Sequence, residues 1–388
     1  MPESSFDQFT TYALIDLDAL GANVRAIKTH IGQACTLIAV VKANAYGHGA
    51  IPVARAALSA GASMLAVARV DEGIALRKAG IGVPILLLGY TVPGESHAII
   101  EHDLTAAVAG IDAARALSER AQALGRTMTI HLKIDTGMGR FGLLPEETIP
   151  AMRAISSLPG LDIEGIYTHF ATADSGDKTF TFQQYTTFTN VLNSLGEAGY
   201  TFRMRHAANS AATLDLPTMH LDAVRIGIAM YGLRPSSEVE PSIALKPVLS
   251  LKSHVARLRI LPGGSSVGYG RTFIAQGPTQ VALIPIGYGD GYHRALSNRG
   301  ITLISGKRVP VIGRVSMDQI TVDATGVSGI NEGDEAVLIG AQGGEHITAE
   351  EIAGLADTIN YEVTTSLLPR VPRIYLRGGE IMEILLEN

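Results

Sequence analysis

Apolar runs alternate with amphipathic stretches from about residue 12 to residue 240. Short runs that are apolar at nearly every position are typical of parallel strands buried on both faces, whereas longer stretches with a period near 3.6 indicate helices. The apolar runs predict strands at 36–41, 64–68, 85–88, 105–108, 129–134, 163–167, 204–207 and 222–226. The intervening patterns predict helices at 50–60, 71–80, 111–124, 146–157 and 180–198. Eight such βα units match a (β/α)8 barrel of the TIM type; a doubly wound sheet is the alternative, because periodicity cannot show that a sheet closes.

The pattern changes after residue 245. Short strand-like runs separated by Gly and Pro turns lie at 248–260, 280–286, 301–304, 308–312, 335–340, 373–376 and 380–385. One helix is predicted near 348–357, with Thr348 as its N-cap and Glu351 three positions later. We therefore expect two domains, a barrel over 1–245 and a mostly-β domain over 246–388.

Composition excludes several classes of protein. The 388 residues are 46% hydrophobic, which is enough for a large core, and 31 Lys and Arg against 37 Asp and Glu leave a net charge of −6 without basic blocks. Disorder and bulk nucleic-acid binding are therefore not expected. There is no apolar run of membrane-spanning length and no secretory pattern in the first ten residues, and Cys35 is the single cysteine, so we expect a cytoplasmic protein. No zinc-type spacing of Cys and His is present, so no metal is expected.

Polar residues gather where the predicted strands end. Barrel enzymes build their active sites at the C-terminal ends of the strands. The residues at or just after these ends are Lys42, Arg140, His169, Asn209, Ser210 and, within the eighth strand, Arg225. Their position predicts a functional site at this end of the barrel.

Two of these features together suggest pyridoxal 5′-phosphate. A lone lysine such as Lys42 more often extends to solvent, but a buried lysine with a lowered pKa is a good amine for Schiff-base chemistry. Asn209–Ser210 opens a predicted helix and Gly227 follows the eighth strand, so their backbone N–H groups could bind a phosphate. An ordinary helix cap is the alternative for Asn209 and Ser210. A reactive lysine beside a phosphate site is what this cofactor requires.

The other polar residues have two interpretations each. Arg140 follows GlyMetGly and could bind a carboxylate with two hydrogen bonds, or form a surface ion pair. His169 could be a satisfied core histidine or take part in proton transfer. Arg225 lies in an apolar strand and needs a partner, because it cannot lose its charge. Tyrosines flanked by glycine at 266–272 and 286–292 mark turns, or present a phenol to a neighbouring pocket.

Nine collinear segments between about residues 12 and 376 resemble the alanine racemase family, the fold type III pyridoxal-phosphate enzymes. The segments are AVVKANAYGHG, HLKIDTGMGR, YTHFATAD, ANSAA, VRIGIAMYG, GYGRT, IPIGYGDG, GRVSMDQ and INYEV. One departure from the family pattern is visible: the segment GRVSMDQ has Ser316 where some relatives carry cysteine. We expect that difference to alter packing or sensitivity to oxidation and not the chemistry.

The resemblance implies a two-base mechanism. Lys42 would bind the cofactor covalently and act as the base for the D-enantiomer, while Tyr269 from the second subunit of a head-to-tail homodimer would be the opposite base. His169 would contact this tyrosine. Arg225 would contact His169 and the pyridine nitrogen, leaving that nitrogen unprotonated and suppressing side reactions such as transamination.

The resemblance also implies roles in binding. Phosphate binding would involve Tyr46, Ser210, Gly227, Ile228 and Tyr361. The substrate carboxylate would be bound by Arg140 and the backbone N–H of Met317, with Asp318 beside it. Lys133 matches a position that is often carbamylated in the family, where the new negative charge orients Arg140.

We thus expect a cytoplasmic, homodimeric isomerase that uses pyridoxal 5′-phosphate to interconvert L- and D-alanine for peptidoglycan. A serine or broad-specificity racemase is one alternative, because the volume of the pocket cannot be read from the sequence. A decarboxylase of related architecture is another, and Arg140 argues against it because it would hold the carboxylate that must leave. A non-catalytic cofactor-binding protein is a third, which the β domain with its Tyr269 segment does not favour.

Overall fold

The computed structural model describes residues 8–239 and 242–386. It divides the chain into two compact units. The barrel unit comprises Leu20–Ala45 and Ala50–Lys246, and the C-terminal unit comprises the residues up to Ala19, Tyr46–Gly49 and those from Pro247 onward. The division at Lys246/Pro247 lies next to the boundary expected from the sequence.

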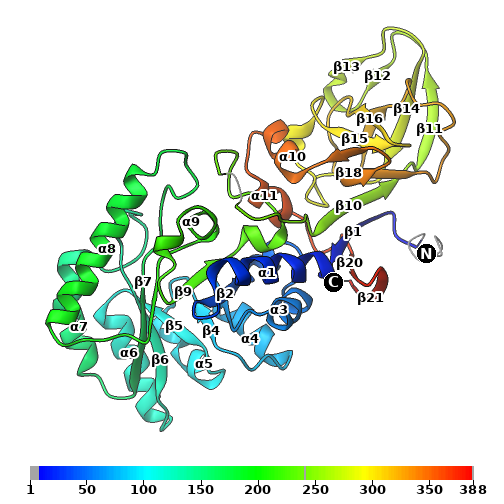
Figure 1. Ribbon diagram of the computed structural model, residues 1–388. Coiled ribbons are helices and arrows are strands. Elements are labelled where there is room, and N and C mark those ends of the chain that lie inside the picture. The colour runs from blue at the N-terminus through cyan, green and yellow to red at the C-terminus, as the bar shows by residue number, and fades with distance from the viewer. Residues whose placement is uncertain (1–7, 240–241, 387–388) are drawn as a thin grey trace. The chain divides into compact units, whose positions relative to one another are not determined.

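The barrel unit contains eight parallel strands that close into a barrel (Figure 1). Closure is made by β9 on β2, where Arg225 lies opposite Ile38. The eight strands are β2 (Thr36–Val40), β3 (Met64–Val67), β4 (Ile85–Leu87), β5 (Thr105–Val108), β6 (Met128–Lys133), β7 (Leu161–Tyr167), β8 (Met204–His206) and β9 (Ala223–Ile226). All eight predicted strands and the closed barrel are therefore confirmed, and the doubly wound alternative is wrong.

Helices and short 3-10 turns precede, connect and follow the barrel strands (Figure 1). The helices are α1 (Leu17–Ile31), α3 (Ala50–Ser59), α4 (Val70–Lys78), α5 (Ser96–Glu101), α6 (Ile111–Ala123), α7 (Thr148–Ser156), α8 (Thr179–Glu197) and α9 (Ser210–Asp215). The 3-10 turns are η2 (Pro93–Glu95), η3 (Pro145–Glu147), η4 (Pro217–Met219) and η5 (Ile228–Tyr231). The short element α2 (Lys42–Tyr46) is a left-handed turn. Within residues 8–239 and 242–386, no helix has both the length and the apolar character that a membrane crossing requires.

The barrel interior is unusually polar on one side. In β6 the apolar Ile130 and Leu132 alternate with His131 and Lys133, and all four side chains are buried. Because successive side chains of a strand point to opposite faces, the two polar residues share one face. His131 on β6 hydrogen-bonds to His206 on β8, two strands away, which places this face inside the barrel.

The C-terminal unit is built on two sheets. The larger has the order β16-β15-β18-β10-β1-β20-β21, with β19 also paired to β18, and the smaller has the order β11-β14-β17. The strands of the larger sheet are β1 (Thr11–Asp16), β10 (Leu249–His254), β15 (Ile301–Ile304), β16 (Lys307–Pro310), β18 (Glu335–Gln342), β19 (Glu345–Ile347), β20 (Arg373–Arg377) and β21 (Glu380–Leu385). The others are β11 (Arg257–Leu261), β14 (Thr279–Ile284) and β17 (Ile320–Asp323), with a ribbon of β12 (Ser266–Val267) and β13 (Phe273–Ile274). The helical elements are η6 (Tyr269–Arg271), η7 (Arg294–Leu296), α10 (Ala349–Ala356) and α11 (Asn360–Thr365).

Three features of this unit differ from the sequence expectation. The run 248–260 forms two strands, β10 and β11, that belong to different sheets. Helix α11 was not expected, and β1 pairs with β10 and β20 of the C-terminal sheet. The predicted start of α10 is confirmed, because the Thr348 hydroxyl accepts a hydrogen bond from the Glu351 N–H at 3.1 Å.

Asn23 on α1 provides a test of the barrel unit. Its buried side chain donates to the Met230 and Lys246 carbonyls and accepts from the Lys246 N–H, at 3.1, 2.8 and 2.8 Å. Asn23→Ala leaves these backbone groups unpaired, which should cost about 2–4 kcal/mol and lower the unfolding midpoint by roughly 5–10 °C in a thermal scan. Asn193→Ala, at an exposed position of α8, is the matched control. An equal midpoint for both variants would show that these three bonds contribute nothing to stability.

Candidate active site

Lys42 lies two residues beyond the end of β2, at the start of a strained turn. Ala43, Asn44 and Ala45 all have φ near +51° to +52°, a left-handed conformation that costs roughly 1–2 kcal/mol for each residue with a side chain. Three hydrogen bonds hold it: the Ala43 N–H to Glu72 Oε1 at 2.5 Å, the Ala50 N–H to Asn44 Oδ1 at 2.8 Å, and the Ala45 N–H to the Val41 carbonyl at 2.9 Å. The turn therefore fixes the position of the Lys42 backbone.

Glu72 serves two segments at once. While Oε1 binds the turn after Lys42, Oε2 accepts the N–H groups of Ala68 and Arg69, at 2.8 and 3.0 Å, at the start of α4. One carboxylate thus joins the loops that follow β2 and β3. Sequence reasoning missed Glu72, because its spacing in an amphipathic helix is that of an ordinary solvent-facing residue.

The Lys42 amine is set up as a nucleophile. Burial lowers its pKa, and the positive charges of Arg140 and Arg225 lower it further, while Glu72 acts in the opposite direction. Among the residues that the structure describes, the amine has no hydrogen-bond or ion-pair partner. A lysine with a lowered pKa is more often uncharged, and the uncharged form is the one that attacks a carbonyl.

Lys133 is the second buried lysine of the barrel interior. Burial, together with Arg225 and Arg140, lowers its pKa from 10.5 to about 7, and Asp135 partly opposes the shift. Its amine lies 4.9 Å from the ring centroid of Tyr167. At neutral pH a large share of this lysine is therefore uncharged, an unusual condition for a lysine.

Arg140 follows a loop that Asp135 orders. The Asp135 carboxylate accepts the backbone N–H groups of Gly137, Gly139 and Arg140 at 2.9–3.0 Å. Gly137 and Gly139 have φ of +127° and +68°, which residues with a side chain rarely adopt. Within the described residues the Arg140 guanidinium has no partner, so it can bind a carboxylate with two hydrogen bonds.

Arg225 is the centre of the hydrogen-bond network. Its guanidinium donates to the Thr168, Ala207 and His206 carbonyls and to the Nδ1 atoms of His206, at 2.8 Å, and of His169, at 3.2 Å. Burial lowers the pKa of Arg225 to about 10, so it is still charged at neutral pH.

The charge on Arg225 decides the protonation of its two histidine partners. Because a guanidinium can only donate, each Nδ1 accepts and each ring proton is on Nε2. Burial and the nearby Arg225 lower the pKa of both His169 and His206 well below the usual value. Both rings are therefore neutral, and His169 presents an N–H on the side away from Arg225.

The segment after β8 and the turn after β9 lie together. Asn209 caps α9, its side chain accepting from the Ala212 N–H at 3.0 Å, as the ordinary interpretation of that residue predicts. The Ser210 hydroxyl accepts from the N–H groups of Gly227 and Ala229, at 3.0 and 3.4 Å. The Ile228 N–H has no partner among the described residues. A hydroxyl and converging N–H groups are the parts of a phosphate site.

The other predicted site residues lie in the C-terminal unit. Tyr46 and Tyr361 are neighbours there, with ring centroids 6.1 Å apart. Tyr269 is 71% exposed in turn η6, between two glycines of positive φ. Met317 is half exposed, and Asp318 accepts a hydrogen bond from Arg370 at 2.6 Å. The structure thus brings Tyr46 to Tyr361, and it presents Tyr269 to solvent.

Charge distinguishes the barrel mouth from an ordinary core. Besides burial, the charges of Arg140 and Arg225 lower the pKa of both Lys42 and Lys133, and the carboxylates of Glu72 and Asp135 oppose these shifts. In the described part of the chain, no group of three or more His, Cys, Asp or Glu could hold a metal ion. The arrangement favours an anionic ligand that carries both a carbonyl for the amine and a phosphate.

Sequence reasoning missed two more residues that support this network, His131 and His206. A signal was present for His131, because His131 and Lys133 occupy alternate positions in the otherwise apolar end of β6, but not for His206, which directly follows Arg205 in β8. The ring of Tyr167 is stacked on His206 at 4.7 Å with an interplanar angle of 4°.

Comparison with known proteins places the chain in a family. The models "Alanine racemase, N-terminal domain" and "Alanine racemase, C-terminal domain" match residues 15–235 and 248–375. An alanine racemase of Desulfosudis oleivorans is 46% identical over 383 residues, which cover 96% of this chain and 98% of the relative.

Solved structures agree with this assignment. Alanine racemase of Bacillus anthracis with bound L-Ala-P has a TM-score of 0.93 at 40% identity, covering 97% of both chains. Alanine racemase of Bartonella henselae with covalently bound pyridoxal phosphate has a TM-score of 0.86 at 31% identity, covering 95% of this chain and 100% of that one. With both family models matched in order and a relative this similar over nearly the whole length, the chain belongs to the alanine racemase family.

Proposed function

We propose that this chain is a pyridoxal-phosphate-dependent isomerase that interconverts L- and D-alanine and so supplies D-alanine for peptidoglycan. The observation that carries the proposal is the Lys42 amine: it is buried, its pKa is lowered, and it has no partner among the described residues while Arg140 and Arg225 lie near it. Membership of the family and the bound pyridoxal phosphate of the Bartonella henselae relative support the cofactor.

The residues of the barrel mouth fit this cofactor. Its aldehyde needs an uncharged amine, which Lys42 supplies, and its phosphate needs donors, which the Ser210 hydroxyl and the Ile228 N–H would supply, with the Gly227 N–H joining them once it turns from Ser210 to the phosphate. The Tyr167 hydroxyl is buried without a hydrogen-bond partner among the described residues, so polar capacity in this interior is left for a ligand. When bound, pyridoxal phosphate acts as an electron sink that acidifies the α-hydrogen of an attached amino acid.

Two bases on opposite sides of the substrate would exchange its α-proton. Lys42 is one base, and its lowered pKa increases the share of the uncharged amine that can accept a proton. Tyr269 of a second subunit is the other, and its 71% exposure in a glycine-flanked turn is compatible with serving another copy of the chain. The His169 Nε2–H would donate to the Tyr269 oxygen and so stabilise its deprotonated form.

The remaining residues would bind and orient. Tyr46 and Tyr361 would complete the phosphate site with Asn209 supporting it as the helix cap, and Arg225 would face the pyridine nitrogen. Arg140 and the Met317 N–H would hold the substrate carboxylate, with Asp318 beside them. A held carboxylate favours exchange of the α-proton over decarboxylation, because loss of carbon dioxide would break the charge-assisted hydrogen bonds to Arg140.

Lys133 would react with carbon dioxide to form a carbamate. Its uncharged amine attacks the carbon, one N–H proton leaves to solvent, and a negative group results. This group would face Arg140, whose charge already acts on Lys133, and would orient the guanidinium for substrate.

We further propose that the enzyme is a homodimer with shared active sites and works in the cytoplasm. A shared site follows if Tyr269 serves the partner. The single cysteine, Cys35, is compatible with a reducing compartment.

Borohydride trapping tests Lys42. Reduction of the cofactor-loaded protein should fix the cofactor to the peptide that contains residue 42, and mass spectrometry identifies that peptide. Lys42→Ala should abolish trapping and lower racemisation of L-alanine at least about 10³-fold. Lys78→Ala, an exposed lysine of α4, should retain both. An adduct on another lysine would contradict the assignment.

The carbamate on Lys133 should depend on pH. Because burial lowers the pKa of Lys133 to about 7, the reactive uncharged amine increases as pH rises through that value. With ¹³C-bicarbonate, the carbamate signal should therefore grow between about pH 6 and pH 8. Lys133→Arg should lack the signal at every pH. A wild-type protein without a carbamate at about pH 8 would refute this modification.

Mixed dimers test the shared site. Lys42→Ala and Tyr269→Ala homodimers should each be nearly inactive, because every site lacks one base. After unfolding and refolding together, about half of all dimers are mixed, with one site doubly altered and the other intact, so roughly a quarter of wild-type activity should return. If a mass-tagged subunit shows that mixed dimers formed and no activity returns, both bases come from one chain.

A further inference from the structure

A continuous chain of side chains connects Arg225 with the opposite end of the barrel. Arg225 contacts His206 Nδ1 at 2.8 Å, His206 Nε2 contacts His131 Nδ1 at 2.9 Å, and His131 Nε2 contacts Glu164 Oε2 at 3.1 Å. Both histidines are fully buried. The four residues come from β9, β8, β6 and β7, so the chain crosses the barrel interior.

Every hydrogen bond in this row of four side chains has its donor on the Arg225 side and its acceptor on the Glu164 side. Arg225 can only donate, so His206 accepts at Nδ1 and carries its proton on Nε2. That proton is donated to His131 Nδ1, so His131 in turn carries its own proton on Nε2. An ionised carboxylate can only accept, and Glu164 therefore completes the chain.

The local structure is shaped for these contacts. Ile130 of β6 pairs with Ile163 of β7, but the next residue, His131, pairs with Gly165, so Glu164 is the extra residue of a bulge. Bulges redirect side chains, and here the carboxylate of the extra residue contacts His131. A Cβ on Gly165 would lie 2.6 Å from the His131 ring, so only glycine leaves room for the imidazole.

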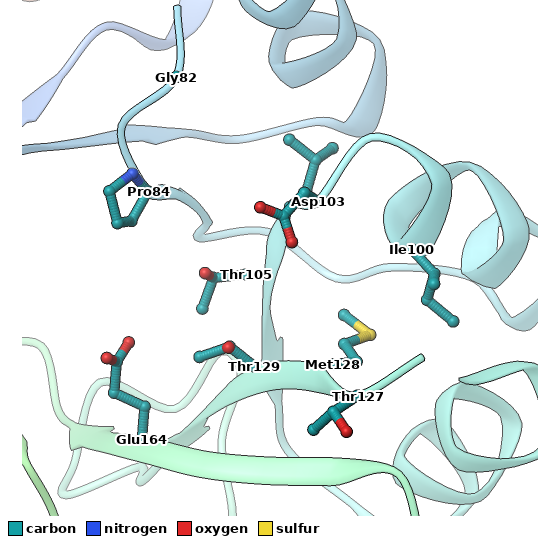
Figure 2. Close-up of a pocket in the computed structure, with 10 residues that line it drawn as sticks. Gly82, Pro84, Ile100, Asp103, Thr105, Thr127, Met128, Thr129 and Glu164 are labelled. Atoms are coloured by element: carbon teal, nitrogen blue, oxygen red, sulfur yellow. The ribbon is translucent and has the colours of Figure 1, made fainter. Parts of the chain in front are cut away.

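Glu164 is the member of the chain that reaches water. It lines a cavity of about 140 Å³ whose other walls include Thr105, Thr129 and Asp103 (Figure 2). The hydrogen bond from His131 lowers the pKa of Glu164, and Arg203 lowers it further, whereas burial and Asp162 oppose the shift. The carboxylate is thus ionised at neutral pH, and it can accept the hydrogen bond from His131.

We propose that Glu164 and His131 are positioning residues that hold Arg225 from the far end of the barrel. They fix the protons of both histidines, so that His206 presents an acceptor to the guanidinium. This inference rests on the proposed function, in which Arg225 faces the pyridine nitrogen. If Glu164 no longer accepts a hydrogen bond, the His131 proton can move from Nε2 to Nδ1 and be donated to His206 Nε2. The His206 proton then lies on Nδ1. There its N–H would face the N–H groups of Arg225, and the repulsion would displace the guanidinium.

The first experiment reads the ring protons directly. In protein labelled with ¹⁵N-histidine and free of cofactor, long-range ¹H–¹⁵N spectra distinguish protonated from unprotonated ring nitrogens. Wild type and Glu164→Gln, which keeps an acceptor oxygen, should show His131 and His206 protonated at Nε2. Glu164→Leu should show a population protonated at Nδ1. Asp103→Asn, which changes a carboxylate of the same cavity that does not contact His131, should resemble wild type.

The second experiment follows the consequence at the cofactor. In Glu164→Leu loaded with ring-¹⁵N pyridoxal phosphate, the pyridine nitrogen should show increased protonation, and kcat for L-alanine should fall about 10-fold with KM changed less than about two-fold. Glu164→Gln and Asp103→Asn should resemble wild type in both measurements.

The outcomes separate this inference from the proposed function. Unchanged histidine protonation in Glu164→Leu, or an equal change in Asp103→Asn, would overturn the positioning role. Altered histidine protonation with an unaltered pyridine nitrogen would overturn its effect on Arg225. A wild-type protein that does not racemise alanine would overturn the function, and the spectra of the cofactor-free protein would still decide whether Glu164 orders the chain. Circular dichroism confirms that each variant is folded.

Discussion

The barrel interior has to accommodate a guanidinium group that keeps its charge. Arg225 cannot be neutralised as a buried carboxyl or lysine can, so its surroundings adapt to it. Three backbone carbonyls and two imidazole nitrogens accept its hydrogen bonds. Burial is the largest cause of the lowered pKa of His169, His206, Lys42 and Lys133, and the charge of Arg225 adds to it in all four. One buried arginine therefore acts on both histidines and on both lysines of the site.

Local patterns were sufficient to predict the barrel but not the complete sheet of the C-terminal unit. Each barrel strand is buried on both faces, so its apolar run is visible without knowledge of its neighbours. Strand β1 has a similar pattern, yet Thr11 pairs with Ser253 and Ala13 with Arg373. Pairings between residues so far apart in the sequence cannot be predicted from local periodicity. The run 248–260 likewise gave no sign that β10 and β11 belong to different sheets.

The site was predictable to the extent that its residues end a strand. Lys42 and His169 stand out because they follow apolar runs at the active end of a barrel, and Arg225 stands out because its charge interrupts an apolar strand. His131 sits within a strand, where a buried histidine is unremarkable, whereas His206 ends a three-residue strand that is not an apolar run. Glu164 is the extra residue of a bulge that the sequence does not reveal. Which subunit's active site Tyr269 serves depends on how the subunits assemble, and a single sequence does not show that assembly.

The wide separation of β1 from its partners affects how the protein is made. On a ribosome, β20 is synthesised about 360 residues after β1, since Ala13 pairs with Arg373. At roughly 5–20 residues per second, β1 has to wait on the order of 20–70 s before this pairing can form. Strand β10 is synthesised earlier and can pair with one edge of β1, since Thr11 pairs with Ser253. The other edge of β1 is unpaired until β20 exists, a condition in which strands aggregate. A chaperone that covers this edge counteracts the hazard, whereas slower synthesis lengthens the interval.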